Sequence, residues 1–167
     1  MNTINFETHL ALTRLYADYA LAVDSGDWDL WPEFFTEDCV YKLQPRENHE
    51  RGFPLATLSF TSKGMLKDRV YGIKETLFHD PYYQRHVVGA PVVRRVEDGR
   101  IYSEANYAVF RTKLDKLSTV FNVGRYIDNR VALIDDLLDC LVFEQGAYFE
   151  RCICISPFQF LTSLFVY

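Results

Sequence analysis

Residues 84–112 read QRHVVGAPVVRRVEDGRIYSEANYAVFRT, and this stretch decides the fold class. Two runs rich in strand-forming residues flank Glu97-Asp98-Gly99. Because Asp-Gly between two such runs is a strong hairpin signal, Gln84–Val96 and Arg100–Thr112 are predicted to pair as antiparallel strands. Proline cannot donate a ladder hydrogen bond, so we expect a bulge, a bend or an edge position at Gly89-Ala90-Pro91.

The alternating pattern continues downstream of this hairpin. Leu117–Ile127 is predicted to form a third strand. Arg130–Phe143 fits either two strands joined by a turn at Asp135-Asp136 or a helix, and the pattern leaves both open. Gly146–Ile155 again has the character of a strand.

Upstream of the hairpin, the pattern is helical. Apolar residues recur at helical spacing from Leu12 to Val23, with Asn5 as a candidate N-cap and Gly26 as a candidate stop. A short second helix is predicted over Asp27–Phe35, because acidic residues and a proline suit a first helical turn.

A strand, a loop and one more helix complete the first half of the chain. Cys39–Gln44 is predicted to be a strand, and Pro45–Gly52 a charged loop before the apolar segment Phe53–Ser62. Ser62 is a candidate N-cap for the following helix. The apolar residues of that helix fall at helical spacing at Leu66, Val70, Ile73 and Leu77.

Helices that come first and antiparallel strands that follow are typical of an α+β fold. We expect a curved antiparallel sheet covered by the N-terminal helices, which together form a cone with an interior pocket. The length of 167 residues predicts a single domain over residues 1–167.

The composition narrows the range of partners. The net charge is −5 and no basic stripe is present, which argues against nucleic-acid binding. No apolar run reaches the length of a membrane span, and the N-terminus lacks the pattern of a signal peptide, so we expect a cytoplasmic protein.

The 13 Phe, 11 Tyr and 2 Trp predict a core or a subunit interface rich in aromatic rings. The apolar end Phe158–Tyr167 is expected to be buried in either place.

The four cysteines are predicted to be buried thiols rather than disulfides or metal ligands. Cys152 and Cys154 would share one face of a strand, which could suit a metal. No second pair of Cys or His residues has the spacing of metal ligands, however.

Four segments, in order, carry a family resemblance: Trp31–Leu43, Arg46–Gly52, Met65–Val70 and Arg85–Gly89. Together they resemble the small (beta) subunit of Rieske-type aromatic-ring-hydroxylating oxygenases, over about Phe6 to Asp128. Within that family they are similar to the subunits of salicylate hydroxylases. The pattern FF-x-x-D-x-x-Y within the first segment also occurs in the wider cone-shaped superfamily of nuclear transport factor 2, ketosteroid isomerase and scytalone dehydratase.

The resemblance implies a non-catalytic structural subunit. It would form a trimer and hold three catalytic large (alpha) subunits in register in a hetero-hexamer that acts on a salicylate-type aromatic substrate. In the family, the large subunit carries a Rieske [2Fe-2S] cluster and a mononuclear non-haem iron. This chain lacks the Cys-x-His, Cys-x-x-His and His/His/carboxylate arrangements that hold those metals, so we expect no metal or cofactor in it and no oxygenation by it alone.

Related cone folds work as isomerases or dehydratases, and this alternative requires a catalytic group in the pocket. Here the candidates are His86, Tyr41 and Asp38. We interpret His86 as a hydrogen-bonded structural histidine, Tyr41 as a core ring and Asp38 as a turn or solvated carboxylate, so that none is assigned a catalytic role. A third possibility is a ligand-binding cone dimer without catalysis.

Two charged features could contact a partner. The loop Pro45–Gly52 offers both signs of charge, as the rim of an interface does, and it reads equally well as a solvated connection. On the predicted strand, Arg94 and Arg95 are expected to point to opposite faces, with the outward arginine able to pair with an acidic partner.

Overall fold

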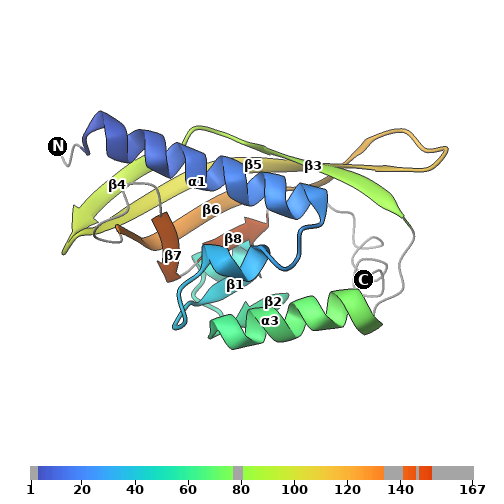
Figure 1. Cartoon of the computed structure of the whole chain (residues 1–167), viewed down its shortest axis with the longest axis horizontal. Helices are drawn as coiled ribbons and strands as arrows, with labels where there is room; N and C mark the ends of the chain where they lie inside the picture. Colours follow the sequence, from blue (N-terminus) through green and yellow to red (C-terminus); the bar gives the residue numbers. More distant parts are fainter. Residues whose placement is uncertain (1–3, 77–80, 134–140, 146, 152–167) are drawn as a thin grey trace.

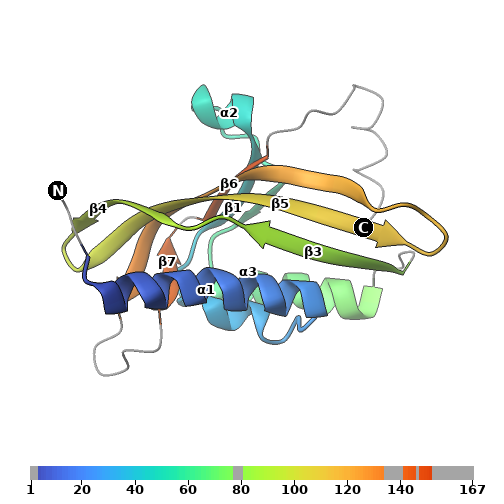
Figure 2. The same cartoon turned by 90° about the horizontal axis from the view of Figure 1, so that it is seen from above.

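Helix α1 (Phe6–Ser25) lies along one face of a long, twisted sheet (Figure 1). The structure is a computed structural model that describes residues 4–76, 81–133, 141–145 and 147–151, with side chains up to Asp128. Turned by 90°, the same view shows α1 and α3 on one side of the sheet and α2 on the other (Figure 2). The expected α+β architecture, with helices over one face of a curved sheet, is confirmed.

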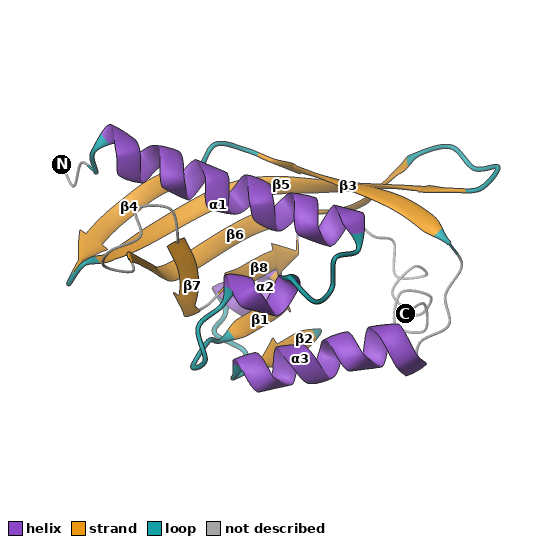
Figure 3. Ribbon diagram, in the orientation of Figure 1, coloured by secondary structure: helices purple, strands orange, loops and turns teal. Residues whose placement is uncertain are grey.

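The described elements follow one another along the chain, and Figure 3 distinguishes helices from strands. After α1 come the 3-10 helix η1 (Trp31–Phe34), β1 (Tyr41–Pro45), α2 (Arg46–Glu50), β2 (Leu58–Phe60), α3 (Lys63–Tyr71), the π-helical turn η2 (Gly72–Thr76), β3 (Tyr82–Val88), β4 (Val92–Glu97), β5 (Arg100–Lys113), β6 (Thr119–Leu133), β7 (Leu141–Gln145) and β8 (Ala147–Arg151).

The sheet is built around β5 and β6. Its strand order is β2-β1-β8-β6-β5-β3, with β4 also paired to β5 and β7 also paired to β6. The pairing of β1 with β8 is parallel, whereas the other pairs of described strands are antiparallel. Consecutive long strands therefore form a meander, and the short β1 closes onto its far side.

Capping residues define where the two predicted long helices begin, and where the first of them ends. The Asn5 side chain accepts a hydrogen bond from the Thr8 N–H at 2.7 Å, and Gly26 ends α1 in the left-handed conformation at φ 72°. The Ser62 side chain accepts from the Met65 N–H at 3.3 Å at the start of α3. These predicted boundaries are confirmed, because each cap supplies a partner for a backbone group that the helix itself cannot satisfy.

The predicted hairpin is also confirmed. Both β3 and β4 pair antiparallel with β5, and the chain leaves the ladder between them at Gly89-Ala90-Pro91, as the proline predicted. The third strand runs further than expected, to Leu133, and β6 then pairs antiparallel with β7. Of the two alternatives for Arg130–Phe143, strands are therefore right.

Two expectations were wrong. Pro45–Gly52 is not simply a loop, because Arg46–Glu50 forms the helix α2, in which Arg46 Nε lies 2.7 Å from Glu50 Oε1 one turn later. Arg94 and Arg95 do not point to opposite faces. The register shifts between Val93 and Arg95, so both arginines lie on the same face as Tyr102 and Glu104, alternate residues of β5: Arg95 lies over the Tyr102 ring and Arg94 pairs with Glu104.

The core lies between α1, η1 and the inner face of the sheet. It includes Leu12, Leu15, Tyr16 and Tyr19 from α1 and alternate residues of β5. Cys39 is a buried free thiol, as expected, and burial raises its pKa, which keeps the thiol protonated.

Several predicted features lie outside the described residues. These are Leu77, Asp135-Asp136, the cysteines Cys140, Cys152 and Cys154, and the segment Phe158–Tyr167.

Candidate functional site

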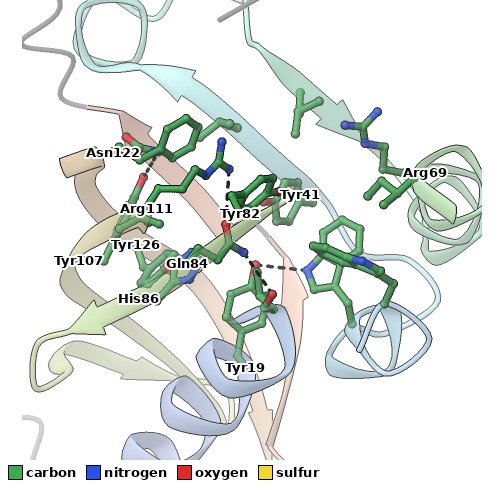
Figure 4. A pocket seen from close by; sticks show the side chains of 18 of the residues that line it. Tyr19, Tyr41, Arg69, Tyr82, Gln84, His86, Tyr107, Arg111, Asn122 and Tyr126 are labelled. Carbon is green, nitrogen blue, oxygen red and sulfur yellow. Dashed lines mark hydrogen bonds between the residues drawn. The ribbon is translucent and has the colours of Figure 1, made fainter. Parts of the chain in front are cut away.

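A pocket of about 190 Å³ lies inside the cone, between α1, the inner face of the sheet and α3. Figure 4 shows its walls from close by. Alternate residues of one strand point to the same face of a sheet, and for this reason β5 contributes Tyr107, Val109 and Arg111 and β3 contributes Gln84 and His86. The sequence pattern predicted an interior pocket, and the strand register determines which side chains line it.

Aromatic rings form much of the wall. Eight of the described lining residues are Phe, Tyr or Trp. Apart from Tyr82, they belong to the core or pack against it: Tyr19, Trp28, Trp31, Tyr41, Tyr107, Phe121 and Tyr126. Trp31 and Tyr41 meet edge to face with ring centroids 5.4 Å apart, and Tyr107 and Tyr126 stack at 4.5 Å. Such ring pairs hold their geometry well, so the wall is a fixed surface of flat groups.

Hydrogen bonds within the wall engage several of the polar groups. Trp31 Nε1 donates to Tyr19 Oη at 3.2 Å, and Asn122 Nδ2 donates to Tyr107 Oη at 3.2 Å. Burial raises the pKa of Tyr19, which therefore stays a neutral phenol at any physiological pH.

Positive charge enters the pocket from two elements. Arg69 comes from α3, whereas Arg111 and Lys113 come from β5, and none of the described lining residues is Asp or Glu. The Arg111 guanidinium lies 3.9 Å from the ring centroid of Tyr82 and 3.5 Å from that of Phe121. Stacking on both rings positions this charge without removing it.

His86 is held by Asp24, which lies at the end of α1. The His86 Nδ1 lies 2.6 Å from Asp24 Oδ1, and the backbone N–H of His86 donates to Asp24 Oδ2 at 2.7 Å. The Asp24 side chain is only 5% exposed. The hydrogen-bonded role predicted for His86 is confirmed, and no local pattern indicated its partner 62 residues away.

Of the other two candidates, Tyr41 lines the same pocket as His86, whereas Asp38 does not. Tyr41 is a buried core ring, as predicted, and its hydroxyl interacts with that of Tyr19. Burial raises the pKa of Tyr41 well above its ordinary value. Asp38 lies exposed in a turn before β1 and does not line the pocket, in line with its interpretation as a solvated carboxylate.

A buried polar cluster behind the pocket was missed by sequence reasoning. The Tyr16 hydroxyl donates to Asp128 Oδ2 and lies 3.0 Å from Ser103 Oγ. Burial raises the pKa of Asp128 to about 7, and Asp128 Oδ1 has no hydrogen-bond partner within the described part of the chain. The period-2 continuation of β6 beyond Tyr126 was the signal that could have placed Asp128 on the inner face.

The polar groups of the pocket are suited to binding a ligand, since cationic side chains and a histidine line it. Within residues 4–76 and the other described ranges, no group of three or more His, Cys, Asp or Glu side chains could hold a metal ion. A histidine oriented by a buried carboxylate can exchange a proton, and arginines can hold an anion. Among the described helices, none has the length and apolarity to cross a membrane.

Comparison with known proteins gives a consistent family. Residues 5–133 match the model of the SnoaL-like domain. The anthranilate 1,2-dioxygenase small subunit of Burkholderia cepacia is 32% identical over 135 residues, which cover 81% of this chain and 84% of that protein. The terephthalate 1,2-dioxygenase terminal oxygenase component subunit beta 1 of Comamonas sp. is 30% identical over 71% of this chain and 77% of its own length.

Solved structures agree with this result. The crystal structure assigned as the beta subunit of an aromatic-ring-hydroxylating dioxygenase from Novosphingobium aromaticivorans superposes with a TM-score of 0.77 at 30% identity, covering 89% of this chain and 92% of that one. The beta subunit of benzoate 1,2-dioxygenase from Burkholderia mallei has the same fold, with a TM-score of 0.69 at 14% identity over 95% of this chain and 99% of its own. The chain thus belongs to the SnoaL-like family and, within it, to the small subunits of aromatic-ring-hydroxylating dioxygenases.

Proposed function

We propose that this chain is a non-catalytic structural subunit, a single domain that binds the large oxygenase subunit of a ring hydroxylase and holds it in its assembly. The observation that carries the proposal is its similarity to a small subunit along 81% of the chain. The large subunit would carry the Rieske [2Fe-2S] cluster and the mononuclear iron, and no residue of this chain is assigned a catalytic or metal-binding role. The proposal places the assembly in the cytoplasm.

The proposal extends to a trimer of small subunits within a three-plus-three hetero-hexamer. The outer face of the sheet, opposite the pocket, supports it, since Tyr83, Val87, Phe110 and Val120 are all exposed there. Phe110 of β5 lies opposite Val120 of β6. Tyr83 and Val87 are alternate residues of β3, and their positions opposite β5 place them on the same face of the sheet as Phe110. Apolar side chains that gather on one face are typical of an interface.

The substrate proposed for the complete enzyme is a salicylate-type aromatic acid, which the enzyme would hydroxylate. The sequence resemblance to salicylate hydroxylases supports this assignment. The named relatives act on other aromatic acids, anthranilate and terephthalate, which fits the same chemical class.

The alternative of a free-standing isomerase or dehydratase is not favoured. The His86–Asp24 pair lies in the pocket, as such an enzyme would need. The relatives named above at 32% and 30% identity, however, are subunits of oxygenases. A solved dehydratase-type structure is only 16% identical, and this similarity is evidence for the fold alone.

The test is co-expression of the chain with the large oxygenase subunit of a ring hydroxylase, followed by native mass spectrometry. We expect a complex of three small and three large subunits, with iron and sulfide in amounts that follow the large subunit. A stable one-to-one heterodimer would contradict the hexamer. Failure to form any complex, together with turnover by the chain alone, would contradict the structural role.

A further inference from the structure

We propose that the pocket of this subunit is itself a binding site for a small aromatic carboxylate: one flat ring that carries one carboxylate group. This goes beyond the structural role, which needs no ligand in the cone. The proposal rests on the size of the cavity, the nature of its walls and the sign of its charge.

The size of the cavity fits a single ring. Its volume is about 190 Å³, and an apolar cavity of about 150 Å³ in another protein is large enough to bind benzene. The additional space matches a carboxylate or another small substituent.

The walls fit a flat ring better than a flexible chain. Trp31 and Tyr41 are fixed edge to face, while Tyr107 and Tyr126 are fixed by stacking. Because aromatic pairs prefer offset or edge-to-face geometry, a ligand ring can extend this existing array without displacing it. Trp31 donates a hydrogen bond to Tyr19, and Asn122 donates one to Tyr107. These polar groups therefore already have partners within the wall.

The charge of the lining selects an anion. Arg69 and Arg111 reach the pocket from opposite sides in Figure 4, and Lys113 adds a third cation. The neighbouring carboxylate, Asp24, is turned to His86, whose Nδ1 and backbone nitrogen its oxygens contact. A guanidinium presents N–H groups in a planar fork that matches a carboxylate, so the arginines can hold the acid group while the rings hold its body.

His86 supplies a further polar contact. Because its Nδ1 faces Asp24, the ring nitrogen left for a ligand is Nε2. A ring hydroxyl or amino group beside the carboxylate could donate to this nitrogen. We therefore expect salicylate to bind at least as tightly as benzoate.

The test is isothermal titration calorimetry on the full-length chain, purified without the large subunit so that its active site cannot contribute. We expect benzoate to bind at one site per chain with a Kd between about 10 µM and 1 mM, as suits a ligand of this size. Benzamide, which lacks the charge, and acetate, which lacks the ring, should each bind at least about tenfold more weakly. No saturable binding of benzoate at about 10 mM, or equal binding of acetate, would overturn the proposal.

Two variants and one matched control locate the site. Arg69→Gln removes a half-buried cation from the lining and should weaken benzoate about tenfold. Lys67→Gln removes the same charge from the same helix, but Lys67 lies exposed outside the pocket, so the affinity should stay within about twofold. An equal loss in both variants would mean attraction to net charge rather than a site, and would overturn the proposal.

Ile73→Trp keeps all the charges and fills the cavity from the rim, where Ile73 is half-buried in η2. It should abolish benzoate binding while the circular dichroism spectrum stays unchanged. Benzoate binding that persists in a folded Ile73→Trp variant would place the ligand elsewhere. Because assembly with the large subunit is measured separately, failure of ligand binding leaves the proposed structural role intact, and the reverse also holds.

Discussion

Asp24 and His86 hold α1 against β3, and each depends on the other for its hydrogen bonds. Replacing His86 by alanine leaves Asp24 Oδ1 without the ring nitrogen that lies 2.6 Å away, in a carboxylate that is 5% exposed. An unsatisfied buried acceptor costs about 1–3 kcal/mol. We therefore expect His86→Ala to lower the free energy of unfolding by that amount in urea denaturation, and to weaken assembly as a result.

The control for this prediction is His9→Ala, because the His9 side chain is exposed on α1. That variant should change the free energy of unfolding by less than about 0.5 kcal/mol. If the complex with His86→Ala kept its melting temperature and its assembly but lost turnover, the structural interpretation of His86 would be wrong.

Asp128 predicts how stability depends on pH. Burial raises the pKa of this carboxyl from its ordinary value of 3.8 to about 7. Between these values the folded chain keeps a proton that the unfolded chain has released, so the carboxyl lowers stability as the pH rises from about 4 to about 7. An asparagine side chain in its place would not titrate, and its oxygen could still accept from Tyr16.

We expect Asp128→Asn to gain stability relative to the wild type as the pH is raised, by up to about 4 kcal/mol between pH 4 and pH 8. Urea unfolding of both proteins at several pH values measures this difference, and other titrating groups cancel in it. A stability difference that is flat with pH would mean that the Asp128 pKa is close to its ordinary value. Asp38→Asn is the matched control, since Asp38 is exposed.

Residue-level prediction from the sequence succeeded where local pattern determines the environment. Asn5, Ser62 and Gly26 were identified correctly because a cap acts on residues next to it in the chain. Asp24 and Asp128 were missed because their roles depend on groups 62 and 112 residues away, and nothing local marks a carboxylate that will be buried. The opposite orientations expected for Arg94 and Arg95 failed because a register shift interrupts the alternation.

Two glycines, one at the end of a helix and one inside a helix, predict opposite effects of the same substitution. Gly26 ends α1 at φ 72°, a conformation that strains any residue with a Cβ. Gly64 lies inside α3, where an added Cβ would meet only the Ser62 side chain, at an ordinary contact distance of 3.6 Å. Gly26→Ala should lower the free energy of unfolding by about 1 kcal/mol. Gly64→Ala should raise it by about 0.5–1 kcal/mol, because alanine favours the helix and restricts the unfolded chain.

Urea unfolding of the two alanine variants tests this pair. The sign of each effect matters more than its size, since backbone conformation is the intended difference between the sites. Destabilisation of similar size in both variants would show that packing around the new methyl group, rather than backbone conformation, controls the result.

At the scale of elements, most of the order of helices and strands could be predicted, because each long element has its own period. The short helix α2 was missed since five residues carry too little periodicity to separate a helix from a charged loop. The parallel pairing of β1 with β8 was also beyond reach, because it joins strands from opposite ends of the chain. The pocket was foreseen as a consequence of the fold, but its lining depends on which face of β3 and β5 points inward.

The whole molecule is expected to carry no iron of its own. The sequence lacks the ligand patterns for a Rieske cluster or a mononuclear iron. Metal analysis of the purified chain after treatment with a chelator should give far less than one iron per chain. About one iron per chain retained after chelation would contradict this prediction and would require a reassessment of the structural role.

The outer face of the sheet gives the prediction for the assembled molecule. Phe110 is 40% exposed and Val120, its partner on β6, is 59% exposed, on the face of β5 opposite the pocket. If this face packs against another small subunit, Phe110→Glu places a charge in an apolar contact and should shift the small-subunit trimer to monomers in sedimentation velocity at micromolar concentration.

The fold of the Phe110→Glu variant should survive, because the glutamate would face solvent in the isolated chain. Leu21→Glu is the control: Leu21 is 66% exposed on α1, away from this face of the sheet, and its replacement should leave the trimer intact. Dissociation by Leu21→Glu but not by Phe110→Glu would move the interface to the helical side of the cone. The pocket would then lie beside the interface rather than on the far side of the sheet from it.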